Sequence, residues 1–228
     1  MDVCKDLDKY AQFMQKQRRM LQDAKSKQGQ RPHDRKDRDK MLFEFMMASM
    51  STVQMSGRAS NNGEQHVQSS FVPPAYPPCT TPLDGLKPVM IEDLRLETHH
   101  RGRYLTLRAI TPPNRMTAIL VIAEDEDGDV TLLQMYQQED EASHPAVDVV
   151  DKGSIFIVKE PFFKITASGD YSLRVDHLSD IVFLTNDDTK TPASWRPRQR
   201  EMRRTAESLK LEGNTLIGKE RYWRAIEK

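Results

Sequence analysis

Aromatic and basic side chains recur together in the middle of the sequence. The residues that stand out are the adjacent Arg103 and Tyr104, the adjacent Phe162 and Phe163, and Arg174. Proteins that bind single-stranded nucleic acid stack the bases on aromatic rings inside a basic groove. These five residues are therefore the candidate nucleic-acid-binding residues. The stretch 124–151 opposes this interpretation, because its ten acidic residues and its lack of Lys and Arg would repel phosphates.

The other reactive side chains form no recognised catalytic or metal-binding pattern. No histidine stands at a zinc-ligand spacing with a cysteine or a second histidine. The acidic turn around Gly128 departs from an EF-hand, because Ala123 and Gln134 would occupy its first and last ligand positions. Asp176 and His177 are adjacent near an expected strand end, as an acid–base pair or as a surface pair. We predict no catalytic residue, no metal and no cofactor.

Composition divides the chain into four segments. Apolar residues recur with helical spacing in residues 1–56, which predicts a helical arm that covers the main domain, pairs within itself or binds a partner. Residues 57–87 are rich in Ser and Pro, which predicts a linker. Residues 88–187 alternate between apolar and polar positions and predict a β domain. Residues 193–228 are predicted to be helical.

Turn signals divide the β domain into five or six short strands. Asp127-Gly128 is a strong hairpin signal between two apolar runs. The number of strands, with one longer insertion between the third and fourth, favours a small closed barrel similar to the oligonucleotide/oligosaccharide-binding (OB) fold. A β-sandwich fits the same periodicity. The predicted fold class is α+β, with a small antiparallel OB-like β-barrel, a helical N-terminal arm and C-terminal helices.

The last segment has the most specific spacing in the sequence. Gly213 and Ala225 are small where two antiparallel helices would approach, and Tyr222 between them would fill the gap near the turn. The pattern resembles a tetratricopeptide (TPR) repeat, which implies a C-terminal TPR-type helical hairpin. Because a repeat is about 34 residues long and a stable array needs about three, we expect one partial repeat in residues 193–228.

Two polar residues of this expected repeat could bind a partner. Lys210 and Asn214 are four residues apart on its first helix. They resemble the first-repeat part of the carboxylate clamp, with which some TPR domains hold the C-terminal carboxylate of chaperones. Both side chains supply hydrogen-bond donors to an anion. The resemblance implies that Lys210 and Asn214 are partner-binding residues and that the partner is a protein.

Four further stretches extend the resemblance over most of the chain. They are residues 91–104 (IEDLRLETHHRGRY), 111–118 (TPPNRMTA), 158–164 (VKEPFFK) and 173–180 (LRVDHLSD). With the TPR start, they resemble the N-terminal region of fungal proteins that join TPR repeats to a SET domain. In that family the SET domain would transfer methyl groups from S-adenosylmethionine to protein lysine. The SET motifs themselves are absent from this sequence, so the resemblance implies ancestry and partner binding.

These observations predict a non-enzymatic protein-interaction module that is a truncated relative of TPR/SET proteins. The first alternative is a single-stranded nucleic-acid-binding OB-like domain, and the second is the regulatory N-terminal part of a protein-lysine methyltransferase. The longest apolar run, residues 118–123, is far shorter than the roughly 20 residues of a membrane span, so we expect no membrane partner. Two distant cysteines without redox or zinc spacing favour the cytoplasm or nucleus.

Overall fold

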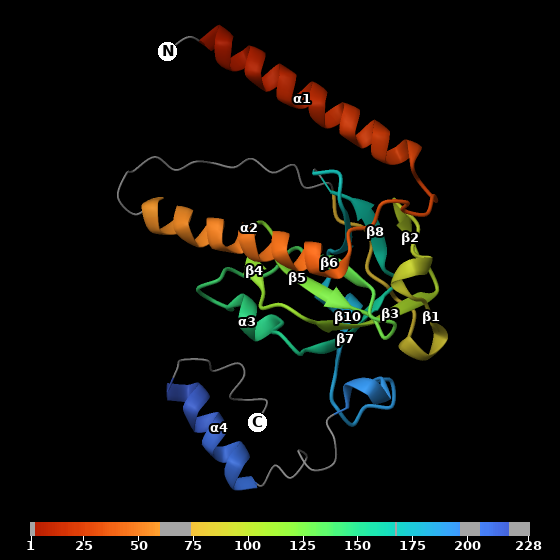
Figure 1. Cartoon of the computed structure of the whole chain (residues 1–228), viewed down its shortest axis with the longest axis vertical. Helices are drawn as coiled ribbons and strands as arrows, with labels where there is room; N and C mark the ends of the chain where they lie inside the picture. Colours follow the sequence, from red (N-terminus) through yellow and green to blue (C-terminus); the bar gives the residue numbers. More distant parts are fainter. Residues whose placement is uncertain (1–2, 60–73, 167, 197–205, 219–228) are drawn as a thin grey trace.

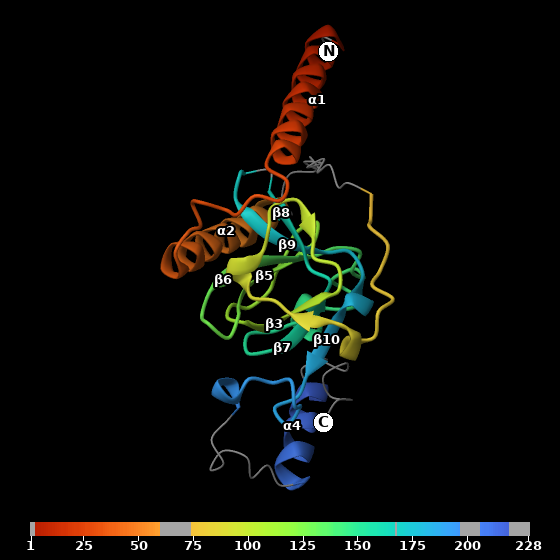
Figure 2. The same cartoon turned by 90° about the vertical axis from the view of Figure 1, so that its right-hand side faces the viewer.

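A β-sheet lies at the centre of the protein, with helices beside it and at both ends (Figure 1, Figure 2). Helix α1 (Val3–Ser26) projects away from the sheet, and helix α4 (Ala206–Gly218) lies at the opposite end. Helix α2 (Arg38–Ala59) lies against strands of the sheet. The predicted α+β class is confirmed. The structure is a computed structural model that describes residues 3–59, 74–166, 168–196 and 206–218.

The sheet of the described residues contains ten strands. They are β1 (Lys87–Pro88), β2 (Thr98–His99), β3 (Arg103–Ala109), β4 (Asn114–Arg115), β5 (Ile119–Glu124), β6 (Val130–Met135), β7 (Ile155–Lys159), β8 (Phe162–Ile165), β9 (Tyr171–Val175) and β10 (Ile181–Leu184). The strands are hydrogen-bonded in the order β10-β7-β3-β5-β6-β9-β8-β2, with β1 on β3 and β4 on β5. Most pairs are antiparallel, but β6 runs parallel to β9 and β1 runs parallel to β3. The predicted hairpin at Asp127-Gly128 is confirmed, and it joins β5 to β6.

A sharp bend separates β7, which pairs with β3, from β8, which pairs with β9. Only Glu160 and Pro161 lie between them, and Glu160 has a φ of 45°, in the left-handed region. The Glu160 carboxylate accepts hydrogen bonds from the Gly102 amide (2.9 Å) and the Arg101 guanidinium (2.5 Å). The bend curls the sheet, but the hydrogen-bonded path ends at β10 and β2. The prediction of a closed barrel is therefore corrected to an open, curled sheet.

The core follows from the two-residue period of the strands. On β3, Leu105, Leu107 and Ala109 are buried while the residues between them are partly exposed. On β5 the buried positions are nearly continuous from Ile119 to Glu124. The outer face of β5 is covered because α2 lies against β5 and β6. One contiguous core therefore fills the inside of the sheet, and part of its outer face is covered as well.

Short helices lie in connections between strands and in the chain before and after the sheet. They are the α-helix α3 (Ala146–Val149) and the 3-10 helices η1 (Leu83–Gly85), η2 (Ile91–Asp93), η3 (Leu178–Asp180) and η4 (Ala193–Trp195). The predicted TPR-type hairpin is not shown. Gly213 lies within the single helix α4, whereas Tyr222 and Ala225 lie outside the described residues. Among the described helices, none is both long and apolar enough to span a bilayer.

Candidate binding site

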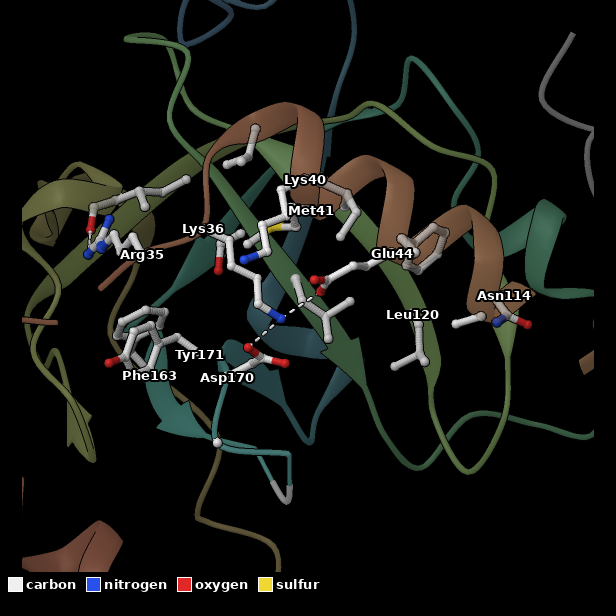
Figure 3. A pocket seen from close by; sticks show the side chains of 18 of the residues that line it. Arg35, Lys36, Lys40, Met41, Glu44, Asn114, Leu120, Phe163, Asp170 and Tyr171 are labelled. Atoms are coloured by element: carbon white, nitrogen blue, oxygen red, sulfur yellow. Dashed lines mark hydrogen bonds and ion pairs between the residues drawn. The ribbon is translucent and has the colours of Figure 1, made fainter. Parts of the chain in front are cut away.

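A cavity lies between the first turns of α2 and the outer face of the sheet (Figure 3). Its volume is about 490 Å³, which is in the range of small-molecule sites, roughly 300–1,000 Å³. Its walls come from α2 and the segment before it, from β5 and β6, and from the turn between β8 and β9. Elements distant in sequence therefore build the cavity together.

The deep walls of the cavity are apolar. Met41 and Phe45 are one helical turn apart on α2 and line the helix side. Ile122 of β5 and Leu132 of β6 are directly paired across the two strands and line the sheet side. Strand alternation points these two side chains out of the core and toward α2. Met41 and Phe45 stay only partly buried, so α2 covers the sheet loosely.

An ion-pair bridge lies across the mouth of the cavity. The Lys36 ammonium contacts the Glu44 carboxylate at 2.6 Å and the Asp170 carboxylate at 2.5 Å (Figure 3). Hydrogen bonds to Asp170 and Glu44 raise the pKa of Lys36. Glu44 belongs to α2 and Asp170 to the β8–β9 turn, so Lys36 links the helix to the sheet. We call these three residues the clasp.

Arg35 and Tyr171 line the other end of the cavity. The Arg35 guanidinium lies 5.5 Å from the centre of the Phe163 ring, and it donates a 2.5 Å hydrogen bond to the Ile91 carbonyl. The Tyr171 hydroxyl donates a hydrogen bond to the Asp34 carboxylate. Burial and then this hydrogen bond raise the pKa of Tyr171 to about 12, so its hydroxyl stays protonated at neutral pH. These contacts position the segment before α2.

The charges around the cavity suit binding rather than proton transfer. In the clasp one ammonium contacts two carboxylates, so one negative charge remains, and Asp34 is committed to Tyr171. Among the described lining residues, the structure gives the Lys40 side chain no ion pair and no hydrogen bond. The apolar walls fit a ligand that has an apolar body. Within the described ranges, no group of three or more His, Cys, Asp or Glu side chains could hold a metal ion.

A second covered surface lies on the outer face of the curled sheet, over β8 and β9. Residues 74–79, which belong to the predicted linker 57–87, run along it; we call them the strap (Figure 2). The Tyr76 ring lies edge-on to His99, His177 and Phe162, with centroid distances of 4.5, 5.7 and 6.1 Å. Its hydroxyl donates to the Arg174 carbonyl at 3.2 Å. The strap is therefore held by specific contacts.

A buried ion pair lies beneath the strap. The Arg174 Nε donates to the Asp176 carboxylate at 2.7 Å, and the two side chains are 4% and 1% exposed. The same carboxylate accepts a hydrogen bond from the Tyr76 amide at 3.2 Å. Arg174 also donates to the Pro74 carbonyl at 3.3 Å, and its guanidinium lies 5.3 Å from the centre of the Tyr136 ring. Asp176 is thus a buried structural anion, which corrects both sequence interpretations of the Asp176-His177 pair.

The structure brings two of the five candidate nucleic-acid-binding residues together. Phe162 and Arg174 are cross-strand neighbours on β8 and β9, beneath the strap. Phe163 points to the other side and is 1% exposed in the core. Arg103 and Tyr104 lie on β3, where the Lys190 ammonium is 5.2 Å from the centre of the Tyr104 ring. The nucleic-acid role of these residues stays a prediction.

The two predicted partner-binding residues lie elsewhere. Lys210 and Asn214 are both exposed on α4, one turn apart, as the sequence pattern requires for a shared face. The clasp, Arg35 and Tyr76 were missed by sequence reasoning. Only the run of prolines around Tyr76 marked that segment, and prolines are equally typical of a plain spacer.

Comparison with known proteins favours one of the predicted functions over the others. No protein-family model matches the sequence. A curated protein of Gibberella zeae named methyltransferase is 40% identical over 167 residues, which cover 73% of this chain and 23% of the relative. The chain is related to a fungal protein named methyltransferase. It spans about a quarter of that relative's length.

This relationship overturns two predictions made from the sequence. The prediction of a non-enzymatic interaction module is wrong, because the relative carries the name of an enzyme. The prediction of no enzymatic activity is corrected for the same reason. The finding favours the alternative in which the chain is a regulatory part of a methyltransferase.

The similarity of this chain to one solved structure is weak. The crystal structure of Schizosaccharomyces pombe Pot1pC bound to single-stranded DNA (CGGTTACGGT) covers 46% of this chain and 90% of that chain. The sequence identity is 12% and the TM-score is 0.34. A TM-score this low carries no argument about fold or ligand.

Proposed function

We propose that this chain is a regulatory, ligand-binding part of a methyltransferase of the protein-lysine class. The observation that carries the proposal is the 40% identity to the Gibberella zeae methyltransferase over 73% of the chain. The resemblance to TPR/SET proteins supplies the protein-lysine class. Since the chain spans 23% of the relative, the methyl-transfer centre of this proposal belongs to the larger remainder.

The buried charges of the described residues support a binding role. Glu124 receives hydrogen bonds from Arg108 and Arg38. Burial opposes its ionisation, but the two arginines outweigh burial and lower the pKa of Glu124. The Asp176 carboxylate is paired with Arg174. A carboxylate held ionised as Glu124 is stabilises the fold and is a poor proton donor at neutral pH.

The proposal includes two finer points on architecture and partners. We propose an OB-like arrangement for the sheet, supported by the antiparallel run β3-β5-β6, the parallel return of β9 beside β6, and the bend between β7 and β8. We also propose that Lys210 and Asn214 bind a protein partner, because both are exposed on one face of α4. A cytoplasmic or nuclear location remains an expectation from the sequence.

A complementation experiment tests the proposed function. The Gibberella zeae methyltransferase is prepared whole and without the segment that matches this chain. Transfer of labelled methyl groups from S-adenosylmethionine to proteins of a fungal extract is then measured. We expect the shortened enzyme to lose activity or selectivity and this chain, added separately, to restore it. Heat-unfolded chain at the same concentration is the control.

Two results would contradict the proposed function. Methyl transfer by this chain alone would place the chemistry within it, against a purely regulatory role. A shortened enzyme that works like the whole enzyme, and that neither binds nor responds to this chain, would remove the chain from methyl transfer altogether.

A further inference from the structure

Helix α2 has apolar side chains on two opposite faces. Met41 and Phe45 face the sheet and line the cavity. On the other side, Phe43, Met46 and Met50 are 65%, 59% and 60% exposed. Their spacing of three, four and seven residues places them on one stripe of the helix. We call these three residues the outer stripe.

The sequence of α2 places no charged residue beside most of this stripe. From Phe45 to Gly57 the helix contains no charged residue. A helix at the surface of a globular protein has charged or polar residues opposite its apolar face, whereas one that is apolar on both faces belongs in an interior or an interface. The outer stripe therefore has the character of a covered surface.

We propose that the outer stripe docks against the methyltransferase part of the polypeptide, the portion that makes up about three quarters of the Gibberella zeae relative. This inference rests on the proposed function and adds the contact surface to it. The relative has a long stretch of chain beyond the matched segment, and we assign the contact with the outer stripe to that stretch. Methionine side chains adapt to irregular apolar surfaces, which suits such a contact.

Charge argues against the other occupants of a helix like this. Amphipathic helices that bind anionic membranes carry Lys and Arg beside their apolar stripe. In α2 the cations nearest the stripe are Arg38 and Lys40 in its first turn, and Arg38 is paired with Glu124. Nucleic acid would require the same missing cations. An apolar protein surface is therefore the occupant that fits the outer stripe.

The start of α2 is fixed to the sheet, so the direction of the outer stripe is set before a partner binds. Arg38 is paired with Glu124 of β5, and the clasp joins Glu44 to Asp170 through Lys36. A surface that is already ordered loses less conformational freedom on binding. The stripe therefore presents a preformed contact surface.

Methionine oxidation tests the proposal directly. The whole chain is exposed briefly to hydrogen peroxide, alone and with the Gibberella zeae methyltransferase from which the matched segment has been removed. Mass spectrometry then follows sulfoxide formation at each methionine. We expect oxidation of Met46 and Met50 to slow several-fold in the mixture. Met90, which is partly exposed outside α2 and does not line the cavity, is the internal control and should keep its rate.

Variants of the stripe give an independent measurement. The double variant Met46→Glu with Met50→Glu should weaken binding to the shortened methyltransferase about tenfold or more. The matched control is Leu178→Glu, at a side chain that is 44% exposed on η3, and it should leave affinity within about twofold. Circular dichroism establishes that both variants fold.

The outcomes separate this inference from the proposed function. Binding without protection of Met46 and Met50, or unchanged binding by the double variant, overturns the outer stripe and leaves the proposed function standing. Protection in the chain alone as its concentration rises, or on lipid vesicles, assigns the stripe to a second copy or a membrane and also overturns it. No binding at all contradicts both.

Discussion

Two areas on the outer face of the curled sheet are covered in different ways. Over β5 and β6 the cover is α2, which is joined to the sheet by ion pairs near its start, makes apolar contacts with it and leaves a cavity of about 490 Å³. Over β8 and β9 the cover is the strap, whose Tyr76 makes ring contacts and hydrogen bonds to Arg174 and Asp176. Both covers come from chain that precedes the sheet.

The difference follows from the physics of the two kinds of contact. Apolar contact is non-directional, so small shifts of the side chains between α2 and the sheet can admit a ligand while the ion pairs hold the start of the helix. A buried ion pair with hydrogen bonds to backbone groups has one favourable geometry, so the strap has little room to move. Helix α2, the loose cover, is therefore the candidate for ligand binding. The strap, the tight cover, holds the side chains around it in place.

The largest expected effect is from Asp176→Asn, beneath the strap. The change leaves the Arg174 guanidinium, 4% exposed, without the carboxylate that it contacts at 2.7 Å. We expect a loss of about 3–5 kcal/mol in the free energy of unfolding, measured with urea, because an uncompensated buried charge is costly. Asp93→Asn is the control, at a pair with Arg31 in which both side chains are about half exposed, and should cost less than about 1 kcal/mol. Equal losses in the two variants would contradict the tight cover.

The sequence predicted the positions of the longer strands well, but it did not predict that the sheet stays open. The hairpin at Asp127-Gly128 has a local signal, and Gly128 has the positive φ of 90° that such a turn uses. The bend at Glu160 also has a positive φ, of 45°, but no local signal marks a glutamate for that conformation. The curl of the sheet depends on this bend, and periodicity alone does not show that the end strands β10 and β2 stay unpaired with each other.

The candidate site was harder to predict than the strands. The Tyr76 amide and the Asp176 carboxylate are 100 residues apart in sequence, and a proline-rich segment is typical of a spacer. Composition singled out Phe162 and Arg174, but their cross-strand register depends on the whole sheet. The clasp joins three separate segments through Lys36, Glu44 and Asp170, and no spacing in the sequence connects them.

Substitution of Tyr76 should have the next largest effect. Tyr76→Ala removes ring contacts with His99, Phe162 and His177, and we expect a loss of about 2–4 kcal/mol in the free energy of unfolding. Tyr76→Phe keeps the ring and removes the hydroxyl that donates to the Arg174 carbonyl, at a cost of about 1 kcal/mol. Hydrogen exchange of residues 74–79 should accelerate in the alanine variant. If both variants lost the same stability, the ring contacts would contribute nothing.

The strap should also make stability depend on pH. Burial, followed by the nearby Arg101, lowers the pKa of His99 from 6.5 to about 4. Below pH 6.5 the unfolded chain therefore binds a proton that the folded chain does not, so stability is complete above about pH 7 and falls toward pH 4. We expect a loss of about 1–3 kcal/mol over this interval, since one pKa unit corresponds to about 1.4 kcal/mol before solvent screening.

His99→Phe isolates this contribution, because the variant keeps a ring beside Tyr76 and cannot titrate. Urea unfolding at pH 7 and pH 4.5 should give a smaller difference for the variant than for the native chain. Burial also lowers the pKa of His100, so part of the pH dependence should remain. An identical pH dependence in the two proteins would mean that His99 is not buried by the strap.

The smallest effect on stability, and the sharpest test of the loose cover, is expected from Asp170→Asn in the clasp. The Lys36 and Asp170 side chains are 24% and 39% exposed, so the change should cost less than about 1 kcal/mol. Its consequence should appear in the cavity, where weaker attachment of α2 increases binding of anilinonaphthalene sulfonate, an apolar anion, measured by fluorescence. Asp127→Asn, at the exposed tip between β5 and β6, removes the same charge away from the clasp and is the control. Salt screens such pairs, so dye binding to the native chain in about 1 M NaCl should approach that of the variant.

Equal dye binding by the two variants would show that charge alone attracts the dye. A stability loss as large as that of Asp176→Asn would show that α2 is held as tightly as the strap, and the two covers would then not differ.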